Sequence, residues 1–318
     1  MTKKNLISGF TLGLALLGAA AMAQAQTYTT LDDHPLGIGQ TFARGISGNN
    51  IVGYYTDSSG NVHGFLYNGS TYTTLDDPLG ALGTYARGIS GNNIVGYYYD
   101  SVPKSYGFLY NGSTYTPLNC PLGVHLTLAC GIDGNNIVGG YVDSSSIAHG
   151  FLYDGSTYTT LDDPLANNIT ILYDISGNNI VGIYRDSFGI MNSFFYDGST
   201  YTTLNDPLAD GETTVYGISG NNIVGSYSDG SGIVHGFLYD GSTYMTLDDP
   251  LGVGGTEVTG IDGNNIVGVY VDSSGNLHSF EASIEPAPEP STLALSGMGV
   301  LAGLLIFRRR KQPRQNKP

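Results

Sequence analysis

Aspartate recurs at one position of this chain in a way that could hold a metal ion. Six aspartates at 43-residue spacing each open a loop of the form Asp-Ser-Ser-Gly or a variant of it: Asp57, Asp100, Asp143, Asp186, Asp229 and Asp272. Carboxylates and loop carbonyls are the oxygen ligands that calcium prefers, so these loops could be cation-binding or ligand-binding turns. Calcium loops usually carry a second acidic residue one or two positions further on, and none stands there. The sequence therefore favours turns in which the aspartate binds nearby backbone, with calcium as the alternative.

Paired carboxylates form a second pattern that could perform chemistry. Asp-Asp occurs at 32–33, 76–77, 162–163 and 248–249, and Asn205-Asp206 stands at the equivalent place of another repeat. Two carboxylates can supply the general acid and the general base of a glycosidase. A catalytic pair needs an environment of its own, whereas these pairs recur in equivalent places. We therefore expect surface or cation-binding carboxylates and predict no catalytic residue.

Histidine and cysteine supply the remaining reactive side chains. His63, His149, His235 and His278 stand one per repeat, so we expect them to lie too far apart to share a zinc ion. Packing across strands and a hydrogen bond to a neighbouring strand are the expected roles of these histidines. Cys120 and Cys130 flank one connection, ten residues apart. In an exported protein such a pair is expected to form a disulfide.

These residues belong to a repeat that fills the centre of the chain. The tripeptide Gly-Asn-Asn begins at residues 48, 91, 134, 177, 220 and 263, so that every interval is 43 residues. Within each copy, β-branched and aromatic runs alternate with turns rich in glycine, asparagine and aspartate, which predicts four strands joined by three hairpins. Four antiparallel strands in each unit of this length are typical of a β-propeller blade. The strand after the longest connection carries small residues, and we expect it to be innermost.

The ends of the repeat array predict how the ring closes. Residues 27–33 have the sequence of a fourth strand without its first three, and residues 259–280 have three strands without their fourth. The two fragments complete one blade, and a ring closed in this way has no free sheet edge. The sequence therefore predicts an all-β fold, a six-bladed β-propeller closed by the N-terminal strand. An open β-solenoid is the alternative.

The N-terminal end has the composition of a signal peptide. Residues 1–25 begin with two lysines, continue with an apolar run and end in Ala23-Gln24-Ala25. This order of a basic start, a short apolar segment and small residues predicts cleavage between Ala25 and Gln26.

The C-terminal end, residues 285–318, has three parts. Pro288-Glu289-Pro290 comes first, an apolar stretch of 17 residues (291–307) follows, and Arg308, Arg309, Arg310 and Lys311 come last. The apolar stretch is just long enough to cross a membrane as a helix. Because such basic residues stay in the cytoplasm, the repeat domain, residues 26–284, is expected outside.

This C-terminal segment resembles the PEP-CTERM sorting signal of Gram-negative bacteria that have exopolysaccharide systems. The resemblance implies that exosortase, a membrane enzyme, recognises an intermediate anchored in the inner membrane and cleaves it near the motif. The mature protein is then expected at the cell surface or outside the cell. A plain membrane anchor is the alternative.

The repeats resemble those of the HAF family of extracellular proteins. His63-Gly64-Phe65, His149-Gly150-Phe151, His235-Gly236-Phe237 and His278-Ser279-Phe280 stand where that family has His-Ala-Phe. The chain departs from the pattern by using glycine or serine for alanine, and Tyr106 and Asn192 replace the histidine in two repeats. The family has no agreed activity, so the resemblance implies location and fold.

Charge narrows the classes of partner. Between the two targeting segments the basic residues are Arg44, Arg87, Lys104 and Arg185, whereas nearly all of the 27 acidic residues lie there. Such an acidic surface repels phosphate backbones, which argues against nucleic-acid binding. We expect a non-catalytic binding or structural domain associated with exopolysaccharide or biofilm, with exosortase and signal peptidase as processing partners. A polysaccharide hydrolase or lyase on a propeller scaffold is the alternative.

Overall fold

The computed structural model describes residues 24–31, 35, 37–102, 104–124 and 126–285. These residues form 24 β-strands, and they belong to one compact unit, Gln24–Glu285. No helix in this part of the chain has the length and apolar character needed to cross a membrane. The predicted transmembrane helix and most of the predicted signal peptide lie outside the described residues.

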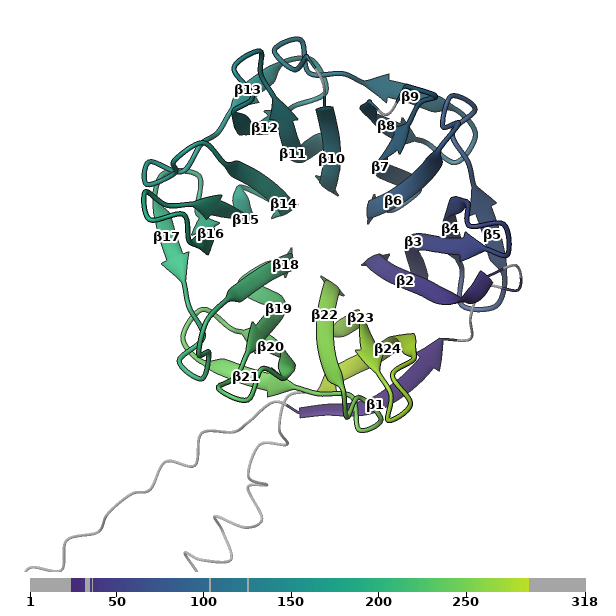
Figure 1. The fold of residues 1–318 in the computed structure, drawn as a ribbon, viewed down its shortest axis with the longest axis vertical. Helices are drawn as coiled ribbons and strands as arrows, with labels where there is room; N and C mark the ends of the chain where they lie inside the picture. Colours follow the sequence, from purple (N-terminus) through teal and green to yellow (C-terminus); the bar gives the residue numbers. More distant parts are fainter. Residues whose placement is uncertain (1–23, 32–34, 36, 103, 125, 286–318) are drawn as a thin grey trace, which may run out of the picture. The chain divides into compact units, whose positions relative to one another are not determined.

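The strands form successive antiparallel meanders of four, which Figure 1 shows as the blades of a ring. Blade 1 contains β2 (Gly37–Ser47), β3 (Asn50–Asp57), β4 (Val62–Tyr67) and β5 (Tyr72–Leu75). Blade 2 contains β6 (Gly83–Ser90), β7 (Asn93–Tyr99), β8 (Ser105–Tyr110) and β9 (Tyr115–Leu118). Blade 3 contains β10 (Leu126–Asp133), β11 (Asn136–Val142), β12 (Ala148–Tyr153) and β13 (Tyr158–Thr160).

The other half of the ring repeats this plan. Blade 4 contains β14 (Thr170–Ser176), β15 (Asn179–Arg185), β16 (Met191–Tyr196) and β17 (Tyr201–Leu204). Blade 5 contains β18 (Thr213–Ser219), β19 (Asn222–Ser228), β20 (Val234–Tyr239) and β21 (Tyr244–Leu247). Blade 6 contains β22 (Gly255–Asp262), β23 (Asn265–Val271), β24 (Leu277–Glu285) and, from the other end of the chain, β1 (Gln24–Leu31).

The β-propeller prediction is confirmed, and the strand after each long connection is innermost, as expected (Figure 1). The count by hydrogen-bonded sheets differs from the six that were expected. Four sheets have four strands each, and a fifth has eight. The eight-stranded sheet arises because one parallel pairing, Leu126 with Ser105, joins β10 to β8 and so links the meanders of blades 2 and 3.

Glycine in the second strand of each blade makes room for a buried phenylalanine. In blade 1, a Cβ atom built on Gly53 would lie 2.9 Å from the ring of Phe65, which is fully buried. The equivalent rings of the other blades are equally buried: Phe108, Phe151, Phe194, Phe237 and Phe280. This packing explains why the repeat carries Ile-Val-Gly in one strand and phenylalanine in the next.

The N-terminal strand closes the ring. β1 pairs antiparallel with β24, with Leu31 opposite Ser279. Tyr28 packs edge-on against Phe280 at 5.2 Å between ring centroids, and Thr30 Oγ1 lies 2.9 Å from the hydroxyl of Tyr270. The predicted closure by the N-terminal strand is therefore confirmed, and the outer edge of β24 is covered.

The closing blade also bonds to the first blade. Ser279 Oγ donates to the carbonyl of Thr41 at 2.7 Å and accepts from the N–H of Ala43 at 2.9 Å. Thr259 Oγ1 donates to the carbonyl of Ala43 at 2.8 Å. These contacts are buried, so the junction between the two ends of the array is as well bonded as an internal junction.

Candidate functional site

A polar notch lies at one end of blade 1, where β3 ends, β4 begins and β5 ends. His63 stacks on the buried ring of Tyr55, with 5.2 Å between centroids. Nδ1 of His63 lies 3.0 Å from both carboxylate oxygens of Asp76, and Nε2 lies 3.3 Å from Oδ2 of Asp57. Thr74 holds Tyr55 from below through a 3.0 Å contact between their hydroxyls. The notch has a volume of about 340 Å³ and opens to solvent.

The charges in the notch support one another. Burial opposes the charge on His63, but the hydrogen bond and negative charge of Asp76, with those of Asp57, raise the pKa of His63 above its ordinary value. The backbone N–H of Asn61, with further donors that include His63, lowers the pKa of Asp57 to about 2. The raised pKa of His63 therefore extends the protonated state of this histidine, between two carboxylates, to higher pH.

The same notch recurs in blades 3 and 5, and blade 6 repeats its histidine, its tyrosine and its loop aspartate, while Asp32, the counterpart of Asp76, lies outside the described residues. In blade 3, His149 Nδ1 lies 2.7 Å from Asp162, and in blade 5, His235 Nδ1 lies 2.8 Å from Asp248. In blade 6, His278 Nε2 lies 3.2 Å from Asp272. Each histidine stacks on a tyrosine of the preceding strand: Tyr141, Tyr227 and Tyr270.

Blades 2 and 4 lack both members of the pair. Where His63 and Asp76 stand in blade 1, blade 2 has Tyr106 and Asn119, and blade 4 has Asn192 and Asn205. The histidine and the carboxylate thirteen residues later therefore change together within a single chain. This joint change was readable in the sequence, and our interpretation of the histidines as packing residues missed it.

The six loop aspartates form turns, as the sequence favoured. Oδ1 of Asp57 accepts from the backbone N–H of Ser59 and of Asn61, each at 2.8 Å. Equivalent bonds to residues two and four positions later occur at all the other loops: Asp100, Asp143, Asp186, Asp229 and Asp272. Within the described residues, no group of three histidine, cysteine or acidic side chains could hold a metal ion.

The two carboxylates of each Asp-Asp pair have different roles. Asp76 faces the notch, whereas Asp77 is buried and caps the connection to the next blade. Oδ1 of Asp77 accepts from the N–H of Leu79 at 2.9 Å, and its own N–H donates to Thr84 Oγ1 at 3.0 Å. Burial raises the pKa of Asp77. The expectation of surface carboxylates therefore applies to the first member of the pair only.

A second site lies at the centre of the ring, where the innermost strands meet. Each innermost strand has a β-bulge, and the extra residue of the bulge lines the central cavity. The six bulged residues, in blade order, are Arg44, Arg87, Cys130, Tyr173, Tyr216 and Thr259. Bulges commonly redirect one side chain out of the alternating pattern of a strand. Here they place six different side chains in an otherwise repetitive ring.

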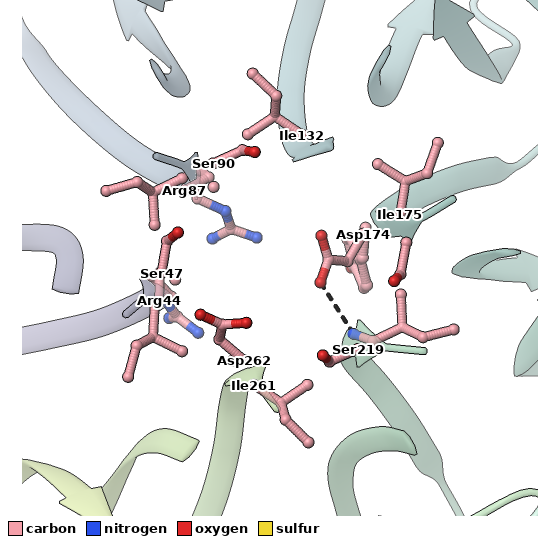
Figure 2. A pocket seen from close by; sticks show the side chains of 18 of the residues that line it. Arg44, Ser47, Arg87, Ser90, Ile132, Asp174, Ile175, Ser219, Ile261 and Asp262 are labelled. Atoms are coloured by element: carbon pink, nitrogen blue, oxygen red, sulfur yellow. Dashed lines mark hydrogen bonds between the residues drawn. The ribbon is translucent and has the colours of Figure 1, made fainter. Parts of the chain in front are cut away.

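The bulged residues give the cavity two unlike sides. Arg44 and Arg87 come from adjacent blades and point into the cavity, while Asp174 lies across from them (Figure 2). Tyr173 and Tyr216 stack on each other with 6.1 Å between centroids. The cavity has a volume of about 140 Å³ and lies next to a narrower one bounded by the bulged residues alone. It is the asymmetric feature of a nearly symmetric ring.

A closed circle of hydrogen bonds surrounds this cavity. Asp262 Oδ2 in blade 6 accepts from the N–H of Gly48 in blade 1 at 2.7 Å, and Ser47 Oγ accepts from the N–H of Gly91 at 3.2 Å. The four remaining junctions repeat this bond: Ser90 to Gly134, Asp133 to Gly177, Ser176 to Gly220 and Ser219 to Gly263. The Gly-Asn-Asn repeat is thus also the contact between blades.

Asp174 lies in the cavity wall, which it shares with Asp133 and Asp262. It occupies a position where the other five blades have glycine, and its Oδ2 accepts from the N–H of Ile218 at 2.9 Å. Burial raises the pKa of Asp174 to about 7. This side chain therefore changes its charge near neutral pH.

The structure contradicts the predicted disulfide, since Cys120 and Cys130 are both free and buried. Cys120 replaces the capping aspartate of the connection and packs in the core cluster with Ala129 and Phe151. Cys130 follows Ala129 on β10 and is directed by the bulge into the central cavity. Ala129 and Cys130 are neighbours on β10, so their side chains point to opposite sides of the strand. Because Cys120 lies in the core cluster with Ala129, the thiols of Cys120 and Cys130 face different parts of the blade. The separation of ten residues between the two cysteines gave no information on the directions of their side chains.

The predicted tail residues, Pro288, Glu289, Pro290 and Arg308 to Lys311, lie outside the described residues. Residues 286–311 match the PEP-CTERM protein-sorting motif. The chain is therefore an exported protein that is anchored at the membrane before exosortase processes it. The cleavage prediction at Ala23, Ala25 and Gln26 is untested by this match.

Solved structures share the fold at low sequence identity. The SapL1 lectin in complex with α-methyl fucoside is 15% identical, with a TM-score of 0.51 over 80% of this chain and 98% of the lectin. A TolB candidate from Agrobacterium tumefaciens is 16% identical, with a TM-score of 0.52 over 78% of this chain and 91% of that one. The fucose-binding, six-bladed lectin of Aleuria aurantia is 13% identical, with a TM-score of 0.49 over 80% and 99%. No curated protein matches the sequence. At these identities the likenesses concern the fold alone.

Proposed function

We propose that this protein is a surface or matrix component whose propeller binds extracellular polysaccharide without catalysing a reaction. The observation that carries the proposal is the notch that blades 1, 3, 5 and 6 repeat. A reaction needs one organised centre, whereas equivalent open notches suit many weak contacts with a repetitive polymer. The PEP-CTERM motif supports export, and we extend it to a surface location among such polymers, in a Gram-negative exopolysaccharide system with signal-peptidase cleavage after Ala25.

The side chains of the notch suit a ligand that is rich in hydroxyl or amino groups. Asp57 and Asp76 can accept hydrogen bonds from neighbouring hydroxyls, and about half of the Asp76 side chain is exposed (49%). His63 orients both carboxylates and is itself partly exposed. The strongly acidic surface favours neutral or amino sugars over anionic ones. We also propose that the repeats are of the HAF type, in which the defining histidine would be this notch histidine.

A glycan array probed with residues 24–285 tests the proposal. We expect weak binding to a few neutral or amino-sugar polymers. A variant with all four notch histidines changed to asparagine should lose that binding, because blade 4 shows that asparagine is accepted at this position. Glu212→Gln, which removes an exposed carboxylate outside the notches, is the matched control and should bind normally. Binding that survives the histidine changes would contradict the proposal.

A polysaccharide hydrolase or lyase remains the second candidate, and one observation favours it. Asp174, with its pKa of about 7, faces two arginines in the asymmetric cavity, and such a carboxyl could exchange a proton near neutral pH. Size-exclusion chromatography of the bound polymer distinguishes the candidates. A constant chain length over many hours supports binding alone, and progressive shortening that Asp174→Asn abolishes supports the enzyme.

A further inference from the structure

The central cavity concentrates positive charge in a protein that has little of it. Arg44 and Arg87 are two of the four basic residues that lie between the targeting segments. Both are bulged residues of innermost strands, so the backbone itself aims them inward. They come from neighbouring blades and line the same cavity (Figure 2).

Neither arginine forms an ion pair with the described residues around it. Every ion pair within the described residues joins a histidine to an aspartate. Arg44 donates one bond, from Nη2 to the hydroxyl of Tyr54 at 3.0 Å, while its Nε is buried without an acceptor. The side chain of Arg87 is half-buried and no hydrogen bond joins it to a described side chain or loop. A buried guanidinium donor without an acceptor, such as Arg44 Nε, is costly, and an oxyanion would satisfy it.

The carboxylates of the cavity are already engaged elsewhere. Asp133, Asp174 and Asp262 accept backbone N–H groups of the next blade, namely those of Gly177, Ile218 and Gly48. These bonds hold the carboxylates against the wall and between blades. The arginine donors therefore remain for a molecule that enters from outside.

We propose that the central cavity binds a small organic carboxylate between Arg44 and Arg87. Two planar guanidinium groups match the two oxygens of a carboxylate through paired N–H bonds. The stacked pair Tyr173 and Tyr216 offers a flat aromatic surface, and Tyr173 offers its hydroxyl, to the body of the same ligand. A volume of about 140 Å³ admits a small molecule and excludes a polymer chain.

Charge favours a monoanion over a phosphate or sulfate dianion. Two arginines face three aspartates in this cavity, so a second negative charge on the ligand would meet repulsion from Asp133, Asp174 and Asp262. This site is separate from the notches, and its ligand is independent of the polysaccharide proposed for them.

Isothermal titration of residues 24–285 with acetate, D-lactate and D-glucuronate tests the proposal, with acetamide, glucose and inorganic phosphate as comparisons. We expect saturable binding of at least one carboxylate, no binding of the neutral compounds, and weaker binding of phosphate. Arg87→Gln should weaken the binding at least tenfold. Lys104→Gln removes the same charge from the surface loop of blade 2 and should leave it unchanged.

Three results would overturn the proposal. They are no carboxylate binding by the wild-type protein, equal binding by Arg87→Gln, and phosphate binding as tight as that of the carboxylates. If Arg87→Gln does not fold, a crystal structure of the wild-type protein with the tightest carboxylate decides. Density for the ligand between the two guanidinium groups supports the proposal, and its absence there refutes it. Loss of polysaccharide binding through the histidine changes would leave these outcomes unaffected.

Discussion

At the scale of residues, the notch shows a dependence that a repeat makes visible. In blades 1 to 5, a histidine stands at this position only where an aspartate stands thirteen residues later, and asparagine replaces that aspartate where tyrosine or asparagine replaces the histidine. The tyrosine persists in every blade, and it stacks on a histidine or on Tyr106 in all blades but blade 4, where asparagine stands at that position, so the packing tolerates all three residues. The histidine is therefore tied to charge and hydrogen bonding with the carboxylate.

A double-mutant cycle in blade 1 measures the coupling free energy between His63 and Asp76. Asp76→Asn should destabilise the domain by about 0.5–1 kcal/mol below neutral pH, as a partly exposed pair allows. The double variant His63→Asn with Asp76→Asn reproduces blade 4 and should recover most of the loss. Because the folded-state pKa of His63 is raised, this coupling is full below about pH 6.5 and fades as the pH rises through the raised value. Chemical denaturation at several pH values would show the fading, and a coupling constant from pH 5 to 9 would contradict it.

Asp174 makes stability depend on pH in the central cavity. Its folded-state pKa is raised from 3.8 to about 7, so the folded protein is most stable below about pH 4 in this respect and loses that contribution as the pH rises to 7. Asp174→Asn should remove the loss and stabilise the domain at pH 8 by about 1–2 kcal/mol, since partial exposure of the Asp174 side chain reduces the full effect. Denaturation of both proteins at pH 5 and pH 8 checks this. A variant that is less stable than the wild type at pH 8 would contradict it.

At the scale of elements, the strands could be predicted from the sequence and the bulges could not. Hairpin turns such as Gly48-Asn49 can be recognised in the sequence, because glycine and asparagine accept the positive φ that these turns need. In the structure, Gly48 has a φ of 58°. The bulge at Arg44 carries no such mark, because it depends on how β2 pairs with β3. For the same reason, the predicted disulfide was wrong: the bulge determines the direction of the Cys130 side chain, and the sequence does not show the bulge.

Closure by β1 is the element-scale prediction with the largest effect. Deleting residues 26–33 removes the partner of β24, the buried side chain of Leu31 and the ring of Tyr28 against Phe280. We expect a loss of about 3–5 kcal/mol, comparable to losing large buried side chains. Circular dichroism during thermal unfolding measures the loss. Deleting residues 286–318 instead removes no described strand and serves as the control; equal melting of both truncations would show that β1 does not close the ring.

At the scale of the whole molecule, the constant spacing of 43 residues between repeats has a geometric reason. Each junction between blades uses the same bond, from a serine or aspartate to the N–H of glycine in the next copy, and the last junction returns to Gly48. An insertion in one innermost strand would displace its member of this circle. The repeats made the fold predictable from the sequence. They did not indicate the central cavity, because the six copies place different bulged residues there.

The C-terminal segment, residues 285–318, is expected to determine how the protein is processed at the membrane. Changing Pro288, Glu289 and Pro290 to alanine should leave the protein inserted in the membrane and prevent its processing, because a residue before proline favours an extended conformation, which suits binding by a membrane enzyme. Mass spectrometry of the surface form from a host with exosortase checks this. Detection of residues 301–307 in the mature wild-type protein would show a plain anchor instead.

The central claim is that repeated notches make a multivalent, non-catalytic binding domain. Isothermal titration of residues 24–285 with a short oligosaccharide of the polymer identified on the array tests it most directly. The account predicts weak binding with several equivalents per domain, and removal of the notch histidines of blades 1 and 3 should reduce the number of sites by about half at unchanged affinity per site. A single equivalent per domain that these changes leave intact would contradict the account.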